Sequence, residues 1–341
     1  MPFAADVAAL RKLPKAELHL HLEGMLLPDR VMSLAEKYSV PLESDELRSR
    51  YTLRGFSQFL ELYKWATSFL REPDDYAQLA QDGVTALHQQ NVVYAEITLS
   101  IGVMLLRKQN VAENFHAIRE VFHRNHSSAT GPQVQFIFDA VRQFGPTPAI
   151  EVARLAADLR TAGVVAFGLG GDELSLPLSN FRPAYQFAAG HGLHLVCHAG
   201  ETGGPEQIKD AIDILHAERI GHGLAAIRSA ALMNILAERQ IPLEICPTSN
   251  LRTNALDIQL NSANSALSHH PLPKLFRHGI PVTISTDDPA MFHTTLLDEY
   301  SAALDMGLSL DELSRVARSS FAHAFLPEAA RQSFLAQRAH N

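Results

Sequence analysis

The 341-residue sequence contains only two cysteines and no long apolar run. Cys197 and Cys246 lie in strand-like apolar segments, and two buried thiols in a chain of this length favour a reducing compartment over a disulfide scaffold. Charges interrupt the first 13 residues, which do not resemble a signal peptide. No segment approaches the roughly 20 apolar residues of a membrane span. We therefore expect a cytoplasmic protein without a membrane partner.

The sequence also lacks a basic patch. The formal net charge is -8, and no run of lysine or arginine is long enough to attract a polyanion. Nucleic acid and anionic membranes are therefore not expected as partners. There is no internal repeat and no Gly/Ser-rich linker, and 46% of the residues are apolar. Residues 1–341 are expected to form one domain with a large core, and its oligomeric state is not indicated.

Eight short β-rich segments recur along the chain, each followed by a helical pattern. This alternation is typical of βα units around a parallel sheet. The expected strands are Ala16–Leu22, Val92–Leu99, Val134–Ala140, Val164–Leu169, Leu193–His198, Arg219–His222, Pro242–Cys246 and Pro281–Ser285. Eight units in one domain predict the α/β class and a closed (β/α)8 TIM barrel.

The connection between the first two strands is too long for one helix. We expect a helical insertion over about residues 25–90, in which Phe56–Phe69 carries aromatic residues and leucines at helical spacing. The insertion is expected to pack on the barrel. A position over the barrel mouth is compatible with that packing, because the insertion leaves from the carboxyl end of the first strand.

The first strand carries two histidines. Alternate side chains of a strand share a face, so His19 and His21 point one way while Leu18, Leu20 and Leu22 point the other way. Two imidazoles at this spacing can chelate a metal ion, or they can be ordinary partly buried strand residues. The motif alone leaves both interpretations open.

Three further motifs follow later strands. His198 and Glu201 flank a glycine turn after the fifth strand, His222 ends the sixth, and Asp287 and Asp288 end the eighth. Adjacent carboxylates are costly unless cations or hydrogen-bond donors receive them. Taken singly, each motif has a structural alternative: a helix cap, a satisfied core histidine or a glycine turn.

Taken together, these motifs favour a metal-dependent hydrolase. The expected strands place them at the carboxyl end of the barrel, where the active sites of this fold lie. Three imidazoles and a carboxylate suit Zn²⁺ with an open position for water, although cobalt, manganese or iron fit the same set. Bound zinc lowers the pKa of water to about 7, and the remaining histidine and carboxylates suit proton transfer.

The sequence resembles the adenosine deaminase family of the amidohydrolase superfamily. The likeness runs in register from Pro14 to about Phe325 and rests on the ordered motifs HLHLEG, GGDE, HAGE, RIGHG, CPTSN and TDDP. It implies a TIM barrel with one zinc ion per chain. It also implies a small-molecule purine substrate, whose 6-amino group is replaced by oxygen with release of ammonia.

The resemblance also implies residue roles. The implied metal ligands are His19, His21, His198 and Asp287. Glu201 would be protonated and give its proton to purine N1, while His222, helped by Asp287, would orient and deprotonate the water that attacks C6. The implied substrate contacts are His21, Glu23, Gly171 and Asp288, with the Gly171 N–H at N3 and the Asp288 carboxylate at N7. A carboxylic acid kept neutral in a dry pocket is a known way to supply a proton donor at pH 7.

Three departures concern the substrate beyond the purine. Glu23 stands where adenosine-specific members usually carry an aspartate that reaches the ribose 5′-hydroxyl, and where adenine-specific members usually carry glutamate. Thr98 stands in place of a usual arginine. The segment Gly168–Gly171 resembles relatives that deaminate aminodeoxyfutalosine, a 5′-extended adenosine analogue. GGDE and RIGHG also differ from the SSE and RIDHG segments of adenine-specific members. We therefore expect adenosine or a 5′-modified adenosine, with adenine as the alternative.

Two other functions fit these residues less well. A non-catalytic metal-binding protein on this scaffold would be expected to lose its proton-transfer residues, yet Glu201 and His222 are present. A two-metal barrel amidohydrolase commonly carries a lysine on the fourth strand, and Val164–Leu169 contains none.

Overall fold

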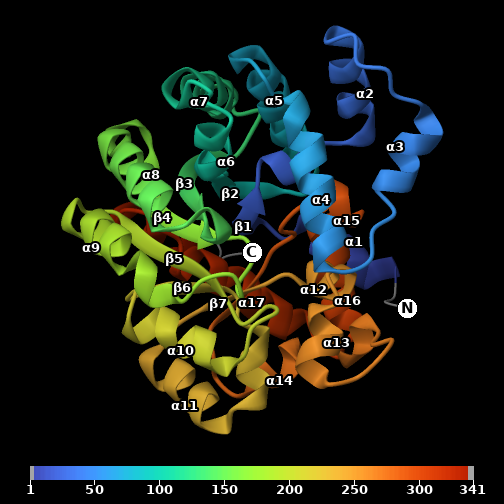
Figure 1. The fold of residues 1–341 in the computed structure, drawn as a ribbon. Coiled ribbons are helices and arrows are strands. Elements are labelled where there is room, and N and C mark those ends of the chain that lie inside the picture. The colour runs from blue at the N-terminus through green and yellow to red at the C-terminus, as the bar shows by residue number, and fades with distance from the viewer. Residues whose placement is uncertain (1–3, 337–341) are drawn as a thin grey trace.

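Eight parallel strands form one sheet in the computed structural model, which describes residues 4–336. The strands follow one another around the sheet in chain order, and every neighbouring pair is parallel. Figure 1 shows the helices arranged around these central strands. The strands are β1 (Lys15–His21), β2 (Val92–Leu99), β3 (Gln133–Val141), β4 (Val164–Gly170), β5 (His194–Ala199), β6 (Arg219–His222), β7 (Leu243–Ile245) and β8 (Val282–Ile284). The predicted (β/α)8 barrel is confirmed, and its eight strands match the expected ones to within one residue at each end.

The ring of strands closes between β8 and β1 at a single residue. Asp287 follows β8 and forms an isolated parallel bridge with Leu20. Its backbone N–H donates to His19 O at 3.1 Å, and its carbonyl accepts from His21 N at 2.9 Å. The side chain of Asp287 is therefore fixed beside the two histidines of β1.

The helices before β3 include those of the expected insertion. They are α1 (Ala4–Lys12), α2 (Pro28–Lys37), α3 (Ser44–Arg50), α4 (Phe56–Ala66), α5 (Pro73–Gln89), α6 (Ile101–Leu106) and α7 (Val111–Ser127), with 3-10 turns η1 (Glu23–Met25) and η2 (Thr67–Phe69). The predicted helix over Phe56–Phe69 is confirmed as α4 continued by η2. Its buried face includes Phe59, whose ring lies 4.9 Å from that of Phe292.

The remaining helices follow the later strands. They are α8 (Pro146–Asp158), α9 (Arg182–Gly190), α10 (Pro205–Asp213), α11 (Ala230–Arg239), α12 (Pro247–Arg252), α13 (Ala255–Leu260), α14 (Leu272–Arg277), α15 (Pro289–Phe292), α16 (Leu296–Asp305), α17 (Leu310–Ala322) and α18 (Glu328–Ala336). The short 3-10 turns are η3 (Arg142–Phe144), η4 (Arg160–Ala162), η5 (Leu178–Phe181), η6 (Leu224–Arg228) and η7 (Leu267–His269). None of the described helices is long and apolar enough to span a membrane.

The chain after α17 closes the amino-terminal end of the barrel. A capping box starts α17, because Ser309 Oγ accepts from Glu312 N while the Glu312 carboxylate accepts from Ser309 N. The helix packs against β1 and β8 and delivers Phe325 to the barrel interior. The Phe325 ring stacks on His194, the first residue of β5, at 4.1 Å between ring centres. The end of the barrel opposite the carboxyl ends of the strands is therefore filled.

The two faces of the strands differ in polarity. Leu18, Leu20 and Leu22 are fully buried toward the surrounding helices, as alternation along β1 predicts. The inner face carries His19 and His21, and other strands contribute buried charged groups to it. The interior of a TIM barrel is usually filled by branched apolar side chains, so these inward polar groups require partners.

Candidate active site

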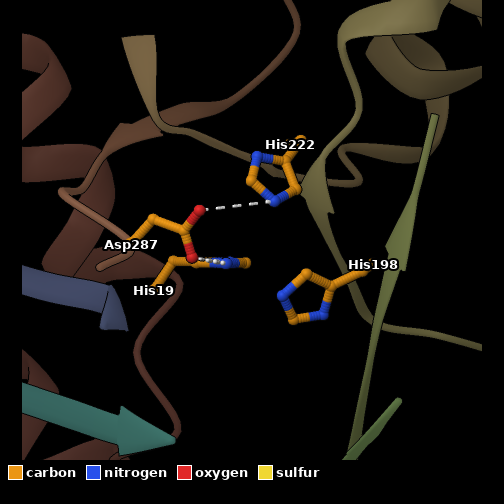
Figure 2. Close-up of side chains that lie close together, drawn as sticks. All are labelled: His19, His198, His222 and Asp287. Carbon is orange, nitrogen blue, oxygen red and sulfur yellow. Dashed lines mark ion pairs between the residues drawn. The ribbon is translucent and has the colours of Figure 1, made fainter. Parts of the chain in front are cut away.

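Three histidines and one aspartate converge at the carboxyl end of the barrel. Each of His19, His198, His222 and Asp287 places a potential ligand atom within 4.8 Å of the others. Figure 2 shows the three imidazole rings and the carboxylate facing a common space. His21 joins the same cluster, because its Nε2 lies 3.3 Å from His198 Nε2 and 3.4 Å from Asp287 Oδ1. The strands thus bring together all four residues predicted as metal ligands, and His222 with them.

Two residues of this cluster have an unusual backbone conformation. His222 and Asp287 have φ angles of 60° and 66°, in the left-handed region that residues with a Cβ seldom occupy. Such conformations cost on the order of 1–3 kcal/mol and concentrate at functional sites. His222 is the last residue of β6 and Asp287 lies three residues after β8, where this conformation directs each side chain over the barrel mouth.

Three of the imidazoles are held neutral. Burial lowers the pKa values of His21, His198 and His222 to about 3. A neutral imidazole has a lone pair free for a metal ion, whereas an imidazolium does not. Burial alone would raise the pKa of Asp287, but contacts with His19, His222 and His21 hold it well below its usual range. The cluster therefore offers neutral nitrogens and an ionised carboxylate.

His19 differs from the other three histidines, because carboxylates face both of its nitrogens. Its Nδ1 lies 2.7 Å from Glu244 Oε2, and its Nε2 lies 3.3 Å from Asp287 Oδ1. Burial lowers the pKa of His19, but these two carboxylates outweigh that effect and raise it to about 10. The contact between Nε2 and Asp287 does not meet the geometry of a hydrogen bond. A metal ion displaces the proton of a histidine that ligates it, so the two carboxylates that raise this pKa also favour a metal cation at Nε2.

Glu201 is a buried carboxylic acid beside the cluster. Burial, together with the charges of Asp287 and Glu173, raises its pKa well above the usual range. Thr253 Oγ1 donates to one carboxyl oxygen at 2.9 Å, and the other oxygen lies 3.7 Å from His222 Nε2. The raised pKa favours the protonated form of Glu201, whose side chain lines the cavity, as general acid catalysis requires.

The loop that carries Glu201 is fixed by the glutamate of the GGDE motif. Glu173 accepts hydrogen bonds from the backbone nitrogens of Gly200, Glu201 and Gly203 at 2.8–3.1 Å. Within the GGDE motif only Gly171 had a predicted role, so this role of Glu173 was not predicted from the sequence. A glutamate shortly after the fourth strand could have indicated a structural role. Its partners could not be identified from the sequence, because they belong to a loop about 30 residues away.

Glycines allow two of the predicted substrate contacts to approach the cavity. A Cβ on Gly24 would lie 2.1 Å from Asp288 Oδ1, so only glycine permits Asp288 its position. Gly171 has a φ of 92°, and a Cβ there would lie 2.4 Å from Gln143 Oε1. Both Gly171 and Asp288 line the cavity. Burial and the neighbouring Asp287 raise the pKa of Asp288 well above its usual range.

Glu23 lies behind the cavity wall. Strand β1 ends at His21, and Glu23 begins the turn η1 with 2% of its surface exposed. Its carboxylate accepts from Ser100 N at 3.0 Å and from the Tyr63 hydroxyl at 3.4 Å. Tyr63 and Ser100 line the cavity, and their hydroxyls lie 2.6 Å apart. A ligand would therefore meet Tyr63 and Ser100 in front of Glu23.

The cluster opens into a cavity of about 480 Å³. Its inner end is formed by the strand-end residues described above. Its outer part is lined by apolar side chains of α4, α6 and the turn after β3, among them Phe56, Leu60, Val103, Leu106 and Phe144. The expected insertion thus forms one wall of the cavity. A volume of this size is typical of sites for small organic ligands.

Several buried polar residues around the site were not predicted from the sequence. Ser249 Oγ donates to Asp287 Oδ2 at 2.7 Å, and the Asn250 amide nitrogen lies 3.1 Å from His222 Nδ1. Both belong to the CPTSN motif, whose residues had no predicted role. Asp139 lines the cavity from β3, and a Cβ on Gly168 of β4 would lie 2.5 Å from its carboxylate. Asp139 and Glu244 are each the one acidic residue of a mostly apolar expected strand, and this feature could have indicated that they belong to the site.

The fold and the site define a TIM-barrel enzyme. Its histidine and carboxylate cluster is suited to a metal ion, and a buried glutamate lies beside that cluster. The family model described as adenosine deaminase matches residues 14–339. The chain belongs to the adenosine deaminase family and is a deaminase.

Similarity to individual proteins extends over nearly the whole chain. The chain is 37% identical to the aminodeoxyfutalosine deaminase of Streptomyces avermitilis over 332 residues, which cover 95% of this chain and 90% of that protein. It is 35% identical to the adenine deaminase of Agrobacterium fabrum, covering 95% and 98% of the two chains. The crystal structure of an amidohydrolase from Burkholderia ambifaria with bound zinc has a TM-score of 0.88 at 25% identity, covering 99% and 93%.

Proposed function

We propose that this chain is a zinc-dependent enzyme that hydrolytically deaminates the 6-amino group of an adenine nucleoside. The observation that supports this most directly is the position of Glu201, a carboxylic acid beside the histidine and aspartate cluster whose pKa burial raises well above its usual range. Relatives named for deamination of an adenine derivative and of adenine itself agree with this chemistry.

The donor set fits a zinc ion. His19, His21, His198 and Asp287 would hold it, since they supply three imidazoles and an ionised carboxylate around one point. The His19 Nε2, buried without a hydrogen bond among the described residues, is an atom that such an ion would satisfy. When bound, zinc lowers the pKa of water to about 7 and so supplies a nucleophile at neutral pH. The zinc-bound structure from Burkholderia ambifaria supports the choice of metal.

The chain's own residues account for the proton transfers. Glu201 gives its proton to purine N1, which makes C6 more electrophilic. His222 and Asp287, whose Nε2 and Oδ2 lie 3.9 Å apart, orient the attacking water and take up its proton between them. The Gly171 N–H and Asp288 hold the opposite edge of the purine. Water adds at C6, and the amino group leaves as ammonia after it has been protonated.

The cavity favours a nucleoside over the free base. The strand-end residues occupy only the inner part of the 480 Å³, and the apolar outer wall leaves room for a substituent beyond the purine. Aminodeoxyfutalosine, the substrate named for one relative, has such a substituent at its 5′ end. Adenine is the second candidate, because relatives of similar identity are named adenine deaminase.

Ammonia release with a panel of substrates tests this proposal. The panel consists of adenine, adenosine, 2′-deoxyadenosine, 5′-methylthioadenosine and aminodeoxyfutalosine. We expect the highest kcat/KM with a nucleoside, and a preference for adenine would contradict that choice while leaving the reaction intact. Metal analysis should give one zinc ion per chain, and two ions would contradict the mechanism. A cytoplasmic location is part of the same proposal, since both cysteines are free and buried.

A further inference from the structure

A fully buried arginine lies directly beneath the metal-ligand cluster. Arg219, the first residue of β6, is 1% exposed. Its Nη2 lies 2.6 Å from a Glu96 carboxylate oxygen, and its Nε donates to Glu244 Oε1 at 2.6 Å. The other oxygen of Glu244 lies 2.7 Å from His19 Nδ1. Three charged contacts in series therefore connect Glu96 on β2 to His19 on β1.

The geometry leaves Glu244 little freedom. Arg219 and His19 occupy its two carboxylate oxygens, and the side chain is almost completely buried. The guanidinium of Arg219 also favours the ionised form of Glu244, because its Nε donates to Oε1 in a direct salt bridge. An ionised carboxylate can only accept, so the proton in the Glu244–His19 hydrogen bond belongs to His19 Nδ1.

Arg219 is itself held by the closed end of the barrel. Its Nη1 donates to His323 O at 2.9 Å, and its guanidinium carbon lies 3.8 Å from the centre of the Phe325 ring. Glu96 in turn accepts from Phe325 N at 2.5 Å and from the Tyr94 hydroxyl at 2.9 Å. A planar guanidinium can satisfy these separate acceptors together, whereas the single ammonium of a lysine cannot.

We propose that Arg219 is a positioning residue of the metal site. Acting through Glu244, it fixes the ring orientation of His19 and keeps the proton on Nδ1, so that Nε2 faces Asp287 and the other ligands. Carboxylates that orient metal-bound histidines have a comparable effect in other proteins. The inference rests on the proposed zinc site, and it assigns a function to the arginine of the RIGHG motif, in which only the histidine had a role.

The test is the zinc affinity of Arg219→Lys, measured by titrating the zinc-loaded chain with a chromogenic chelator. We expect affinity to fall by about 10- to 100-fold. Arg142→Lys is the matched control, because Arg142 is also buried but donates to the neutral acceptors Leu176 O and Gln207 Oε1. Its zinc affinity should stay within about twofold of the parent. A folded Arg219→Lys chain with the parent affinity would overturn the proposal.

A double-mutant cycle separates action through Glu244 from a general structural effect. Glu244→Gln alone should weaken zinc binding, and adding Arg219→Lys to it should change the affinity by less than about twofold, because the link is already broken. Fully additive losses would show that Arg219 acts by another route and would also overturn the proposal.

A further variant covers the case in which Arg219→Lys does not fold. Glu96→Gln with Arg219→Gln removes one buried charge of each sign and still deprives Glu244 of its cation. It should fold and show the same loss of affinity. If neither variant folds, Arg219 serves the stability of the barrel alone and the proposal fails. The parent chain tests the zinc site separately: if it binds no zinc, the proposed function fails before this inference is reached.

Discussion

The inner and outer parts of the cavity are lined by different kinds of side chain. The inner end consists of titratable side chains at the ends of β1, β5, β6 and β8, and the described contacts pair these groups with one another or with buried partners. The outer wall consists mainly of apolar side chains from α4, α6 and the turn after β3, with the polar side chains of Glu61, Lys64 and Gln143 among them. The inner end is fixed by the sheet, whereas the outer wall depends on the segments that connect the strands.

This difference between the inner end and the outer wall indicates that different parts of the cavity determine the chemical step and the substrate specificity. Strand ends hold reacting groups at defined distances, and a change there should alter the chemical step. Connecting segments in TIM barrels vary more freely and shape the contacts with the rest of the substrate. Changes to the inner end should therefore lower kcat for every substrate, while changes to the outer wall should alter KM for some substrates only.

The largest effect is expected for Glu201→Gln. The amide keeps the size of the side chain but cannot give a proton to N1, so kcat should fall by at least 100-fold for every substrate, with zinc content unchanged. Steady-state kinetics and metal analysis of the purified variant check this. A loss below tenfold, about 1.4 kcal/mol, would exclude Glu201 as the essential acid.

Glu299→Gln is the control for this variant. Glu299 is also a buried glutamate, whose pKa burial raises to about 7, but it holds Thr248 and Thr294 outside the cavity lining. Its replacement should leave kcat within a few-fold of the parent, although it can lower stability.

The next effect concerns the metal ligands. His19→Ala or Asp287→Ala should lower bound zinc and activity together, because each removes one of four predicted ligands. Metal content by atomic emission, compared with kcat for the same preparation, checks this. Full zinc occupancy in either variant would contradict the ligand assignment. His191→Ala, at an exposed histidine stacked on Phe187, should retain both zinc and activity.

A smaller effect, limited to specificity, is expected for Glu23→Asp. The shorter side chain cannot hold Ser100 N and the Tyr63 hydroxyl as Glu23 does, so the two cavity residues should shift. We expect kcat/KM to redistribute among adenosine, adenine and the 5′-extended analogue by about tenfold, or 1.4 kcal/mol. If all substrates lose kcat by one common factor, Glu23 acts on the metal site or on folding instead.

The smallest effect is expected on the outer wall. Leu106 lines the cavity with 63% of its surface exposed, and Leu106→Ala should raise KM about threefold for a 5′-extended nucleoside and leave adenine unchanged. Leu174 is similarly exposed, at 71%, but does not line the cavity, so Leu174→Ala is the matched control. Equal effects of the two variants, or an equal rise in KM for adenine, would remove the distinction between the two parts of the cavity.

The sequence predicted the inner end better than its surroundings. Periodicity along β1 placed His19 and His21 on one face, and each later motif lay at the end of an expected strand, so the barrel topology brought them together. Glu244 and Arg219 could not be assigned in this way, because their roles depend on contacts between β2, β6, β7 and β1. Which inward side chains meet across a barrel is set by strand stagger, which local patterns do not encode.

Glu23 illustrates the same limit at the end of a strand. Extrapolation of the alternation along β1 placed it on the face of the histidines and within reach of the substrate. The strand ends at His21, however, and the turn η1 directs the carboxylate to Ser100 and Tyr63. Alternation holds only while the backbone stays extended, and the point at which it stops is the least certain feature of a sequence pattern.

The closure of the barrel at Asp287 would link the folding of this chain to the proposed metal ion. The residue that joins the last strand to the first by two backbone hydrogen bonds is also a predicted ligand. An ion held by Asp287 and the β1 histidines binds only the closed ring, so it stabilises that state by mass action. The amide protons of His21 and Asp287, which lie in this seam, should consequently exchange with solvent more slowly in the zinc-loaded chain than after chelation.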